Sequence, residues 1–168
     1  MQAIVILLGL VLPFLLVETW WSARNEARLR ERGAVEPRDD VYAWMRIVYP
    51  GMFLAMAIEG LVRGPADTRL LAAGATVFLG AKLLKWWAIL TLGSLWSFRV
   101  LVVPGAPLIA TGPYRFLRHP NYVGLAGEAI GAAMLWQAPI AGLIGGLAFG
   151  ALVWRRIAVE EAALGLRK

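Results

Sequence analysis

Cysteine is absent from this chain of 168 residues, and histidine occurs only once. The lack of cysteine excludes disulfide frameworks, zinc ribbons, iron–sulfur centres and thiolate nucleophiles. Charged residues are also scarce, at 17% of the chain, whereas 60% of the residues are apolar. Soluble domains are usually about 45–50% apolar. The composition and the mean hydropathy of +0.65 therefore indicate a membrane protein.

Positive charge exceeds negative charge, with a formal net charge of +6. A basic chain can bind nucleic acid, but the arginines gather between apolar stretches and not along one amphipathic face. We therefore expect no nucleic-acid partner. Because we find no internal repeat, low-complexity linker or second domain, we expect residues 1–168 to form one integral membrane domain.

Several apolar stretches are long enough to cross a bilayer, which requires about 20 mostly apolar residues. They are residues 1–21, 41–62 and 70–92, and the two halves of residues 122–154. The first stretch lacks the basic start and the small-residue cleavage site of a signal peptide, so we interpret it as a mature helix kinked at Pro13. The predicted fold class is all-α, a polytopic transmembrane helical bundle of about five spans.

The last apolar region is interrupted at residues 137–139, a turn signal inside hydrophobic sequence. We therefore predict that the last two spans form a tight helical hairpin. Small residues on both arms would let the two backbones approach closely. They are Gly124, Gly127, Gly131, Ala132 and Ala133 on the first arm, and Gly142, Gly145, Gly146 and Gly150 on the second.

Several charged residues lie within or beside the spans. Lys82 and Lys85 share a helical face next to two tryptophans, so we expect interfacial anchors. We expect Glu18 to be an interfacial end residue. For Glu128 two interpretations are open, contact with a bound cofactor or hydrogen bonding between helices.

The basic residues predict the orientation. Residues 22–40 contain five arginines, residues 93–121 contain three, and the tail after Trp154 has four basic residues, whereas the intervening turns have two and none. The positive-inside rule then puts the N-terminus outside and the C-terminus, with both long connections, in the cytoplasm. This pattern fits a bacterial inner membrane, with the endoplasmic reticulum as the physical alternative. Residues 24–40 are expected to be a solvated segment, or a lid.

Residues 105–124 (GAPLIATGPYRFLRHPNYVG) are too polar to cross a membrane. Pro120 suits the first turn of a helix and disposes His119 to an extended backbone. The start of that helix favours a bound anion such as a carboxylate, through its unpaired N–H groups and its dipole. An interfacial loop, with arginines on lipid phosphates and tyrosines at the headgroups, is the alternative interpretation.

A second polar cluster follows the last apolar stretch. Arg156 and Glu160 are four residues apart, next to Arg155 and Glu161. A solvated helix end with a weak ion pair would explain them. However, this tail and residues 105–124 flank the same hairpin and emerge on the same predicted side, so we expect them to converge.

The motif RHPNYVG at residues 118–124, preceded by GPYR at 112–115 and followed by Glu160–Glu161, resembles the isoprenylcysteine carboxyl methyltransferase family of integral membrane methyltransferases. Residues 22–26 and 32–36 look more like a bacterial branch associated with type III polyketide synthases, which O-methylates alkylpyrones or alkylresorcinols. The resemblance covers most of the chain.

The resemblance implies S-adenosylmethionine as methyl donor and a lipophilic acceptor from the bilayer, and no metal. The implied cofactor-binding residues are Tyr114, Arg118, His119, Pro120, Tyr122, Gly124, Arg156, Glu160 and Glu161. Of these, Arg118, His119 and Glu160 are the candidate catalytic residues, and Arg156 is the expected partner of the cofactor carboxylate.

The acceptor determines whether a base is needed. A prenylcysteine carboxylate arrives ionised, since the ordinary pKa of a carboxyl group is about 4, whereas a phenol with a pKa of about 10 needs His119 or a glutamate to take its proton. Arg118 or Arg99 is expected to orient an anionic acceptor. Only seven residues follow Glu161, fewer than the longer C-terminal helix that this family suggests, which leaves room for a phenol-like or enol acceptor.

Two other classes compete with the methyltransferase. Membrane sterol or enone reductases share a similar loop but bind a reduced nicotinamide dinucleotide, and they are generally longer. A non-enzymatic membrane scaffold or transporter subunit needs only the spans and predicts no saturable cofactor site. A pore is disfavoured because no span carries charged residues on one face through its depth.

Overall fold

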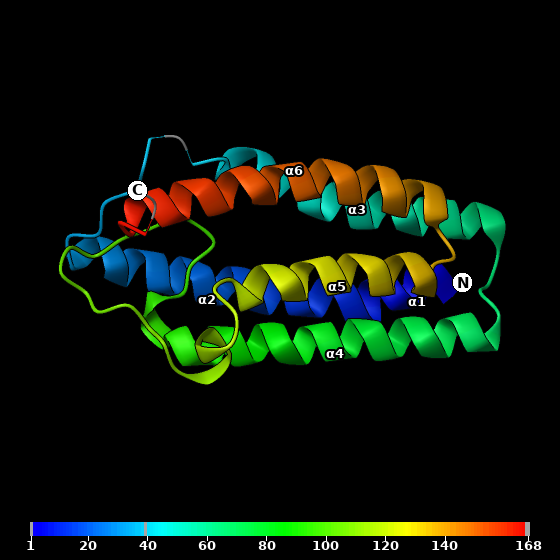
Figure 1. Ribbon diagram of the computed structural model, residues 1–168. Helices are drawn as coiled ribbons and strands as arrows, with labels where there is room; N and C mark the ends of the chain where they lie inside the picture. Colours follow the sequence, from blue (N-terminus) through cyan, green and yellow to red (C-terminus); the bar gives the residue numbers. More distant parts are fainter. Residues whose placement is uncertain (1, 39, 167–168) are drawn as a thin grey trace.

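The computed structural model describes residues 2–38 and 40–166 and is a bundle of long helices (Figure 1). Its elements are α1 (Gln2–Ile6), the π-helical turn η1 (Leu7–Val11), α2 (Leu12–Glu31), α3 (Tyr42–Arg63), α4 (Thr68–Leu92), the short 3₁₀ helices η2 (Gly93–Leu95) and η3 (Gly112–Arg115), α5 (Pro120–Leu135) and α6 (Pro139–Ala163). An isolated bridge between Val35 and Val102 is the one β pairing among the described residues. The predicted all-α polytopic class is confirmed.

Four helical stretches are long and apolar enough to cross a membrane: Gln2–Glu31, Tyr42–Arg63, Thr68–Leu95 and Pro139–Ala163. Helix α5 has 16 residues, about 24 Å at 1.5 Å per residue, which is less than the hydrocarbon thickness of about 30 Å. The expected fifth span is therefore too short to cross by its length alone. Local sequence sets both ends, since Pro120 starts the helix and Gln137, with a φ of 51°, follows its end.

The N-terminal helix is continuous and longer than predicted. The N–H of Leu12 bonds the carbonyl of Leu7 five residues earlier, and this π-type turn lies next to Pro13, which has no N–H to donate. This turn precedes Pro13, and the predicted kink at Pro13 itself stays a prediction. The helix then continues to Glu31, with Asn25 buried and its amide donating to the carbonyls of Gly93 at 2.9 Å and Trp96 at 2.8 Å. Our expectation of a solvated segment from residue 24 is therefore wrong for this part.

The hairpin of α5 and α6 is present, but its arms separate beyond the turn. A Cβ on Gly131 would lie 2.6 Å from the backbone nitrogen of Phe78 on α4, and the glycine face of α5 packs on that helix. On α6, a Cβ on Gly145 would contact Met52 of α3, and around Gly146 there is open space. The prediction that small residues of the two arms meet is confirmed only near the turn, where a Cβ on Gly142 would lie 2.6 Å from the Cβ of Ala133. Further along it is wrong, because each arm packs on a different long helix.

Glu18, Lys82, Lys85 and Glu128 form a cluster that we call the charge quartet. These side chains come from α2, α4 and α5, and each residue is at most 5% exposed. The expectations of interfacial lysine anchors and an interfacial Glu18 are thus wrong. For Glu128, the helix-to-helix interpretation agrees with the structure, because its carboxylate contacts both lysines.

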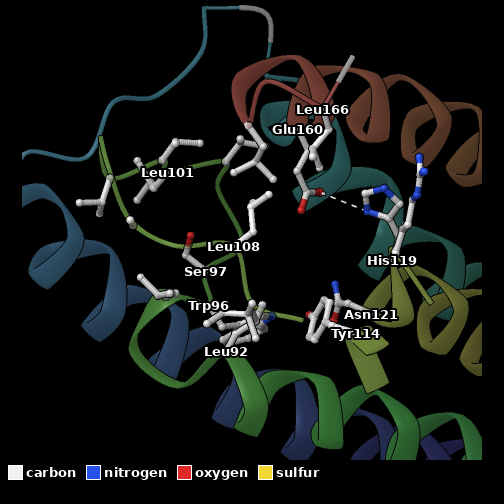
Figure 2. Close-up of a pocket in the computed structure, with 18 of the residues that line it drawn as sticks. Leu92, Trp96, Ser97, Leu101, Leu108, Tyr114, His119, Asn121, Glu160 and Leu166 are labelled. Carbon is white, nitrogen blue, oxygen red and sulfur yellow. Dashed lines mark ion pairs between the residues drawn. The ribbon is translucent and has the colours of Figure 1, made fainter. Parts of the chain in front are cut away.

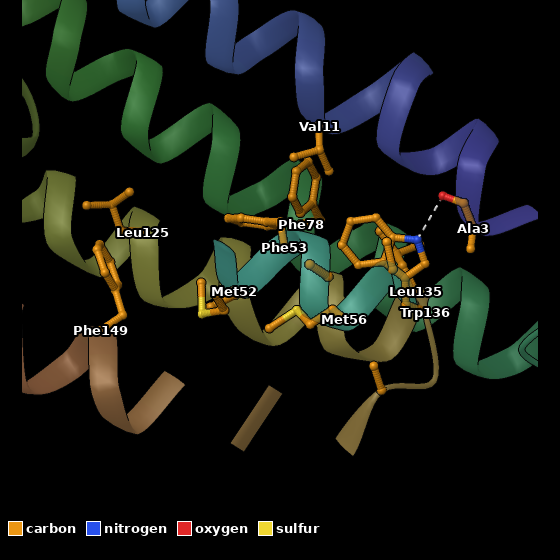
Figure 3. Packing of buried hydrophobic residues seen from close by; sticks show 14 of the residues in the cluster. Ala3, Val11, Met52, Phe53, Met56, Phe78, Leu125, Leu135, Trp136 and Phe149 are labelled. Atoms are coloured by element: carbon orange, nitrogen blue, oxygen red, sulfur yellow. Dashed lines mark hydrogen bonds between the residues drawn. The ribbon is translucent and has the colours of Figure 1, made fainter. Parts of the chain in front are cut away.

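The apolar core follows the interior of the bundle and includes the buried Phe53, Met56, Phe78 and Trp136 (Figure 3). The indole N–H of Trp136 donates to the carbonyl of Ala3 at 3.1 Å and ties the chain start to the α5–α6 turn. The opposite end of the bundle carries the connection before α3, the long connection before α5 and the C-terminal end of α6 (Figure 1). The two predicted functional segments therefore lie at the same end.

Candidate functional site

A cavity of about 420 Å³ opens at this end of the bundle (Figure 2). The connection between α4 and α5, the first turn of α5 and the last turns of α6 form its wall. The polar lining residues include Tyr114, Arg118, His119, Asn121, Tyr122, Arg156 and Glu160, and the apolar ones include Leu92, Leu95, Trp96, Leu101 and Leu108. The cavity is thus polar where α5 and α6 meet and apolar along the connection.

His119 and the two terminal acids meet at the polar side. The Nε2 of His119 lies 3.2 Å from Oε1 of Glu161, and its Nδ1 lies 4.0 Å from Oε2 of Glu160, the pair marked in Figure 2. The hydroxyl of Tyr122 donates to the same Glu160 oxygen at 2.7 Å. The expected convergence of residues 105–124 with the tail is therefore present in the structure.

The local sequence explains how His119 reaches this position. Pro120 occupies the start of α5, and His119 precedes it with φ −130° and ψ 62°, outside the helical region, as a residue before proline prefers. Tyr122 is one turn further and projects toward α6, with its ring centroid 5.7 Å from that of His119. The His-Pro sequence thus places two polar rings side by side at the helix start.

Arg156 is buried behind this pair. Its guanidinium donates to Asp40 at 2.6 Å, to the carbonyl of Phe98 and to the hydroxyl of Tyr122 at 3.0 Å. The second Asp40 oxygen accepts the backbone N–H of Val100 at 3.1 Å. These contacts occupy the guanidinium, so the geometry assigns it to holding the cavity wall and does not favour the expected pairing with a cofactor carboxylate.

Three other predicted residues, Pro120, Gly124 and Glu161, lie outside the cavity lining. Pro120 is buried at the start of α5, and a Cβ on Gly124 would lie 2.8 Å from the Cβ of Lys85, so this glycine serves helix packing. Glu161 adjoins the site through His119. Arg118, by contrast, is exposed and lines the cavity.

Tyr114 is half-buried in η3 and lines the same cavity. Burial, and then the negative charge of Glu160, raise the pKa of the Tyr114 hydroxyl above its ordinary value of 10.0. The phenol therefore keeps its proton at neutral pH and is available as a hydrogen-bond donor. The structure thus places Tyr114 at the cavity, and its role in cofactor binding stays a prediction.

The segment before α3 is attached to the connection that forms the apolar wall. Val35 and Val102 exchange backbone hydrogen bonds of 2.9 and 3.0 Å, and Arg99 pairs with Glu36 at 2.5 Å. Burial acts to raise the pKa of the Glu36 carboxyl, but hydrogen bonds from Arg99 and Arg30 outweigh it and hold that pKa below its ordinary value. Arg99 lines the cavity with its guanidinium engaged in this way, so the segment braces the wall, and the lid interpretation stays a prediction.

The sequence reasoning missed Asp40, Asn121 and Trp96. Asp40 belongs to the run of charges that we expected to be solvated, and its position directly before an apolar helix was the available signal. Asn121 lies inside the recognised motif, and its Oδ1 is buried without a hydrogen-bond partner among the described residues. Trp96 is 3% exposed and lines the cavity floor.

Comparison with known proteins agrees with this geometry. The model of the isoprenylcysteine carboxyl methyltransferase family matches residues 72–165, which include most of the cavity lining. The uncharacterized protein YpbQ of Bacillus subtilis (strain 168) is 29% identical over 143 residues, 85% of each chain. An uncharacterized protein of Haemophilus influenzae (strain ATCC 51907 / DSM 11121 / KW20 / Rd) is 23% identical over 144 residues, 85% of this chain and 84% of that one.

No solved structure matches the chain. The family match extends from α4 through α5 to the end of α6 and covers more than half of the chain. It includes the RHPNYVG motif and both terminal acids, the residues on which the sequence resemblance rested. The chain therefore belongs to the isoprenylcysteine carboxyl methyltransferase family.

Proposed function

We propose that this protein is an S-adenosylmethionine-dependent O-methyltransferase that acts on a lipophilic acceptor at the cytosolic boundary of the membrane. One observation carries the proposal: a single cavity joins the His119–Glu160–Tyr122 cluster to an apolar wall at one end of the bundle. A small polar donor and a long apolar acceptor require these two surfaces side by side. Family membership supports the methyltransferase class.

The residues present suit this cofactor. The cavity volume of about 420 Å³ lies within the range of about 300–1,000 Å³ usual for ligand pockets. Glu160 offers a carboxylate to cationic groups, and the unpartnered Oδ1 of Asn121 offers an acceptor to a hydroxyl or amine. The positive end of the α5 dipole lies beside them and favours a carboxylate. When bound, S-adenosylmethionine supplies an electrophilic methyl group on a sulfonium.

The apolar wall suits the acceptor chain. Leu92, Leu95, Leu101 and Leu108 provide a surface for an alkyl or prenyl chain, and burying that chain excludes water from the polar end. Holding two reactants in line at about 3–3.5 Å supplies much of the catalysis in such a transfer. Prenylcysteine carboxylates and the hydroxyls of alkylpyrones or alkylresorcinols are the acceptor classes that we propose.

The chain also provides a base for the less acidic acceptors. His119 lines the cavity, with its ring nitrogens 3.2 Å from Glu161 and 4.0 Å from Glu160. A phenolic acceptor, with an ordinary pKa of about 10, needs a base, and His119 is the residue that we propose takes its proton. Arg118, exposed at the cavity, is positioned to orient an anionic acceptor.

The direct test is a radiolabelled methyl-transfer assay in nanodiscs. The panel contains prenylcysteines, alkylpyrones and long-chain phenols, each with its short-chain analogue as the matched control. We expect transfer to one long-chain class and little transfer to its short analogue. Saturable binding of a reduced nicotinamide dinucleotide, with none of S-adenosylmethionine, would contradict the proposal and favour a reductase.

Two substitutions test the cofactor site. Arg118→Ala and Glu160→Ala should abolish S-adenosylmethionine binding in calorimetry, because each removes a charged group from the cavity lining. Both variants should still be extracted and remain monodisperse. Arg115→Ala and Glu31→Ala are the matched controls, since these residues are exposed and do not line the cavity. Unchanged cofactor affinity in both site variants would refute the assignment.

A further inference from the structure

The charge quartet lies away from the cavity lining, and the proposed chemistry does not use it. Lys82 Nζ is 3.0 Å from an oxygen of Glu18 and 3.0 Å from an oxygen of Glu128, and Lys85 Nζ is 2.6 and 3.3 Å from the other two oxygens. Tyr49 of α3 also donates to Glu128. Each lysine therefore bridges both acids, and the ring of four charges is neutral.

Among the described residues, these are the only ion pairs that join α2, α4 and α5 to one another. Glu18 belongs to α2, the lysines to α4 and Glu128 to α5. Ionisable groups are rare within membrane-embedded helices because they are costly to bury there. An uncompensated charge is costlier still, so all four groups favour the one arrangement in which every pair forms.

The apolar surface between α4 and α5 discriminates poorly between alignments. Gly124, Gly127 and Gly131 form the close contacts of α5 with α4, and their spacings of three and four residues approximate one helical turn. A slide of α5 by one turn in the direction of its C-terminus would bring Gly124 to the place of Gly127 and Gly127 to the place of Gly131. The two tightest contacts would therefore keep a glycine, whereas the ion pairs of Glu128 would all be broken.

We propose that the charge quartet sets the register of α5 against α2 and α4, and so positions His119 and Tyr122 opposite Glu160. A slide of one turn, about 5.4 Å, would carry Tyr122 away from a carboxylate that it now contacts at 2.7 Å. The register inference rests on these contacts alone. Its consequence for cofactor binding rests in addition on the proposed function.

The test replaces the ring with apolar groups of similar length. Exchanging buried ion pairs for apolar residues often leaves stability unchanged or raises it, so the exchange separates register from stability. The variant is Glu18→Met, Lys82→Met, Lys85→Met and Glu128→Met. Because the chain has no cysteine, two introduced cysteines can be spin-labelled selectively. We place them at two exposed positions, Leu90→Cys on α4 and Ile130→Cys on α5, so that the distance between the labels reports the alignment of the two helices.

We expect the distance distribution of the quadruple variant in detergent to shift or broaden by about 5 Å, one helical turn, at an unchanged melting temperature. An unchanged, narrow distribution would overturn the proposal. The control carries Val77→Met and Leu83→Met, which are exposed on α4, and should keep the original distance.

A milder variant covers the case in which the quadruple variant does not fold. Lys82→Met with Glu128→Gln removes one positive and one negative charge and leaves the 2.6 Å pair of Glu18 and Lys85. The same broadening is expected, and its absence would again overturn the proposal.

Calorimetry with S-adenosylmethionine forms a second arm, in which the milder variant should lose at least tenfold in affinity. If the unsubstituted protein binds no S-adenosylmethionine, the proposed function fails, while the spin-label distance still decides the register.

Discussion

At the scale of single residues, Arg156 connects parts of the chain that lie far apart in sequence. Its guanidinium contacts Asp40 from the segment before α3, Phe98 from the long connection and Tyr122 from α5. A guanidinium presents several N–H donors in a rigid plane, which a lysine ammonium does not reproduce. The site wall therefore depends on an arginine that need not contact a ligand.

The pair of Arg156 and Asp40 should be strongly coupled, because both side chains are only 5% exposed. Arg156→Gln or Asp40→Asn alone leaves a buried charge without its partner and should cost about 3–5 kcal/mol. Denaturation in detergent micelles should show that the double variant loses clearly less free energy of unfolding than the two single variants lose together. Additive losses, within about 0.5 kcal/mol, would show that the two side chains do not act as a pair.

At the scale of the helices, α5 is short and is held by close backbone approach. Its glycine face lies against α4, and the position of Gly131 has no space for a methyl group, because the nearest atoms are the backbone of Phe78. Helix α6 instead packs on α3, and its N-terminus is capped from that helix, since Glu59 accepts the N–H of Ala141 at 2.6 Å. Each arm of the hairpin thus takes its position from a different partner.

Two glycine substitutions should separate these environments. Gly131→Ala forces α4 and α5 apart and should destabilise the protein by about 1–3 kcal/mol. Gly146→Ala enters open space and should be neutral or stabilise the helix by up to about 1 kcal/mol. Thermal denaturation of the two variants in one detergent compares them directly. Equal stability of both variants would contradict the packing of α5 on α4.

At the scale of the whole molecule, the long connections and the C-terminal end gather at one end of the bundle (Figure 1). The turn between α3 and α4 lies at the opposite end. Exposed apolar side chains, among them Leu83, Leu143 and Leu147, cover the outer faces of the helices between these ends, as a lipid-facing surface requires. This arrangement confines the cavity to one membrane boundary.

The orientation can be tested with single cysteines in the cysteine-free chain. A membrane-impermeant maleimide should label Phe116→Cys and Leu166→Cys from the cytoplasmic side and Thr68→Cys from the other side, as the basic connections predict. All three positions are exposed. Labelling of residues 116 and 68 from the same side would contradict both the orientation and the path of the chain.

Much of the site was predictable from local pattern. Recognisable chemistry is present in the His119-Pro120 step, in the tyrosines of the loop and in the two terminal acids. These segments flank the same pair of apolar stretches, so the sequence also predicted that they lie at one end of the bundle. Asp40 was not predictable in this way. Its role depends on Arg156, which is 116 residues away, and no local spacing encodes such a contact.

Composition and hydrophobic pattern were sufficient for the membrane class and the approximate helix positions, because burial of apolar residues and proline and glycine chemistry act over a few neighbouring residues. The RHPNYVG motif and the two terminal acids were sufficient for the family resemblance. The partner of each helix was decided only in three dimensions. A glycine face can pack on more than one helix, so the sequence does not name its partner. Likewise, the role of a buried charge such as Lys82 depends on its counter-charge, which Glu128 supplies from another helix. Helix packing and charge pairing depend on contacts between residues far apart in the sequence, so they form only when the whole bundle folds.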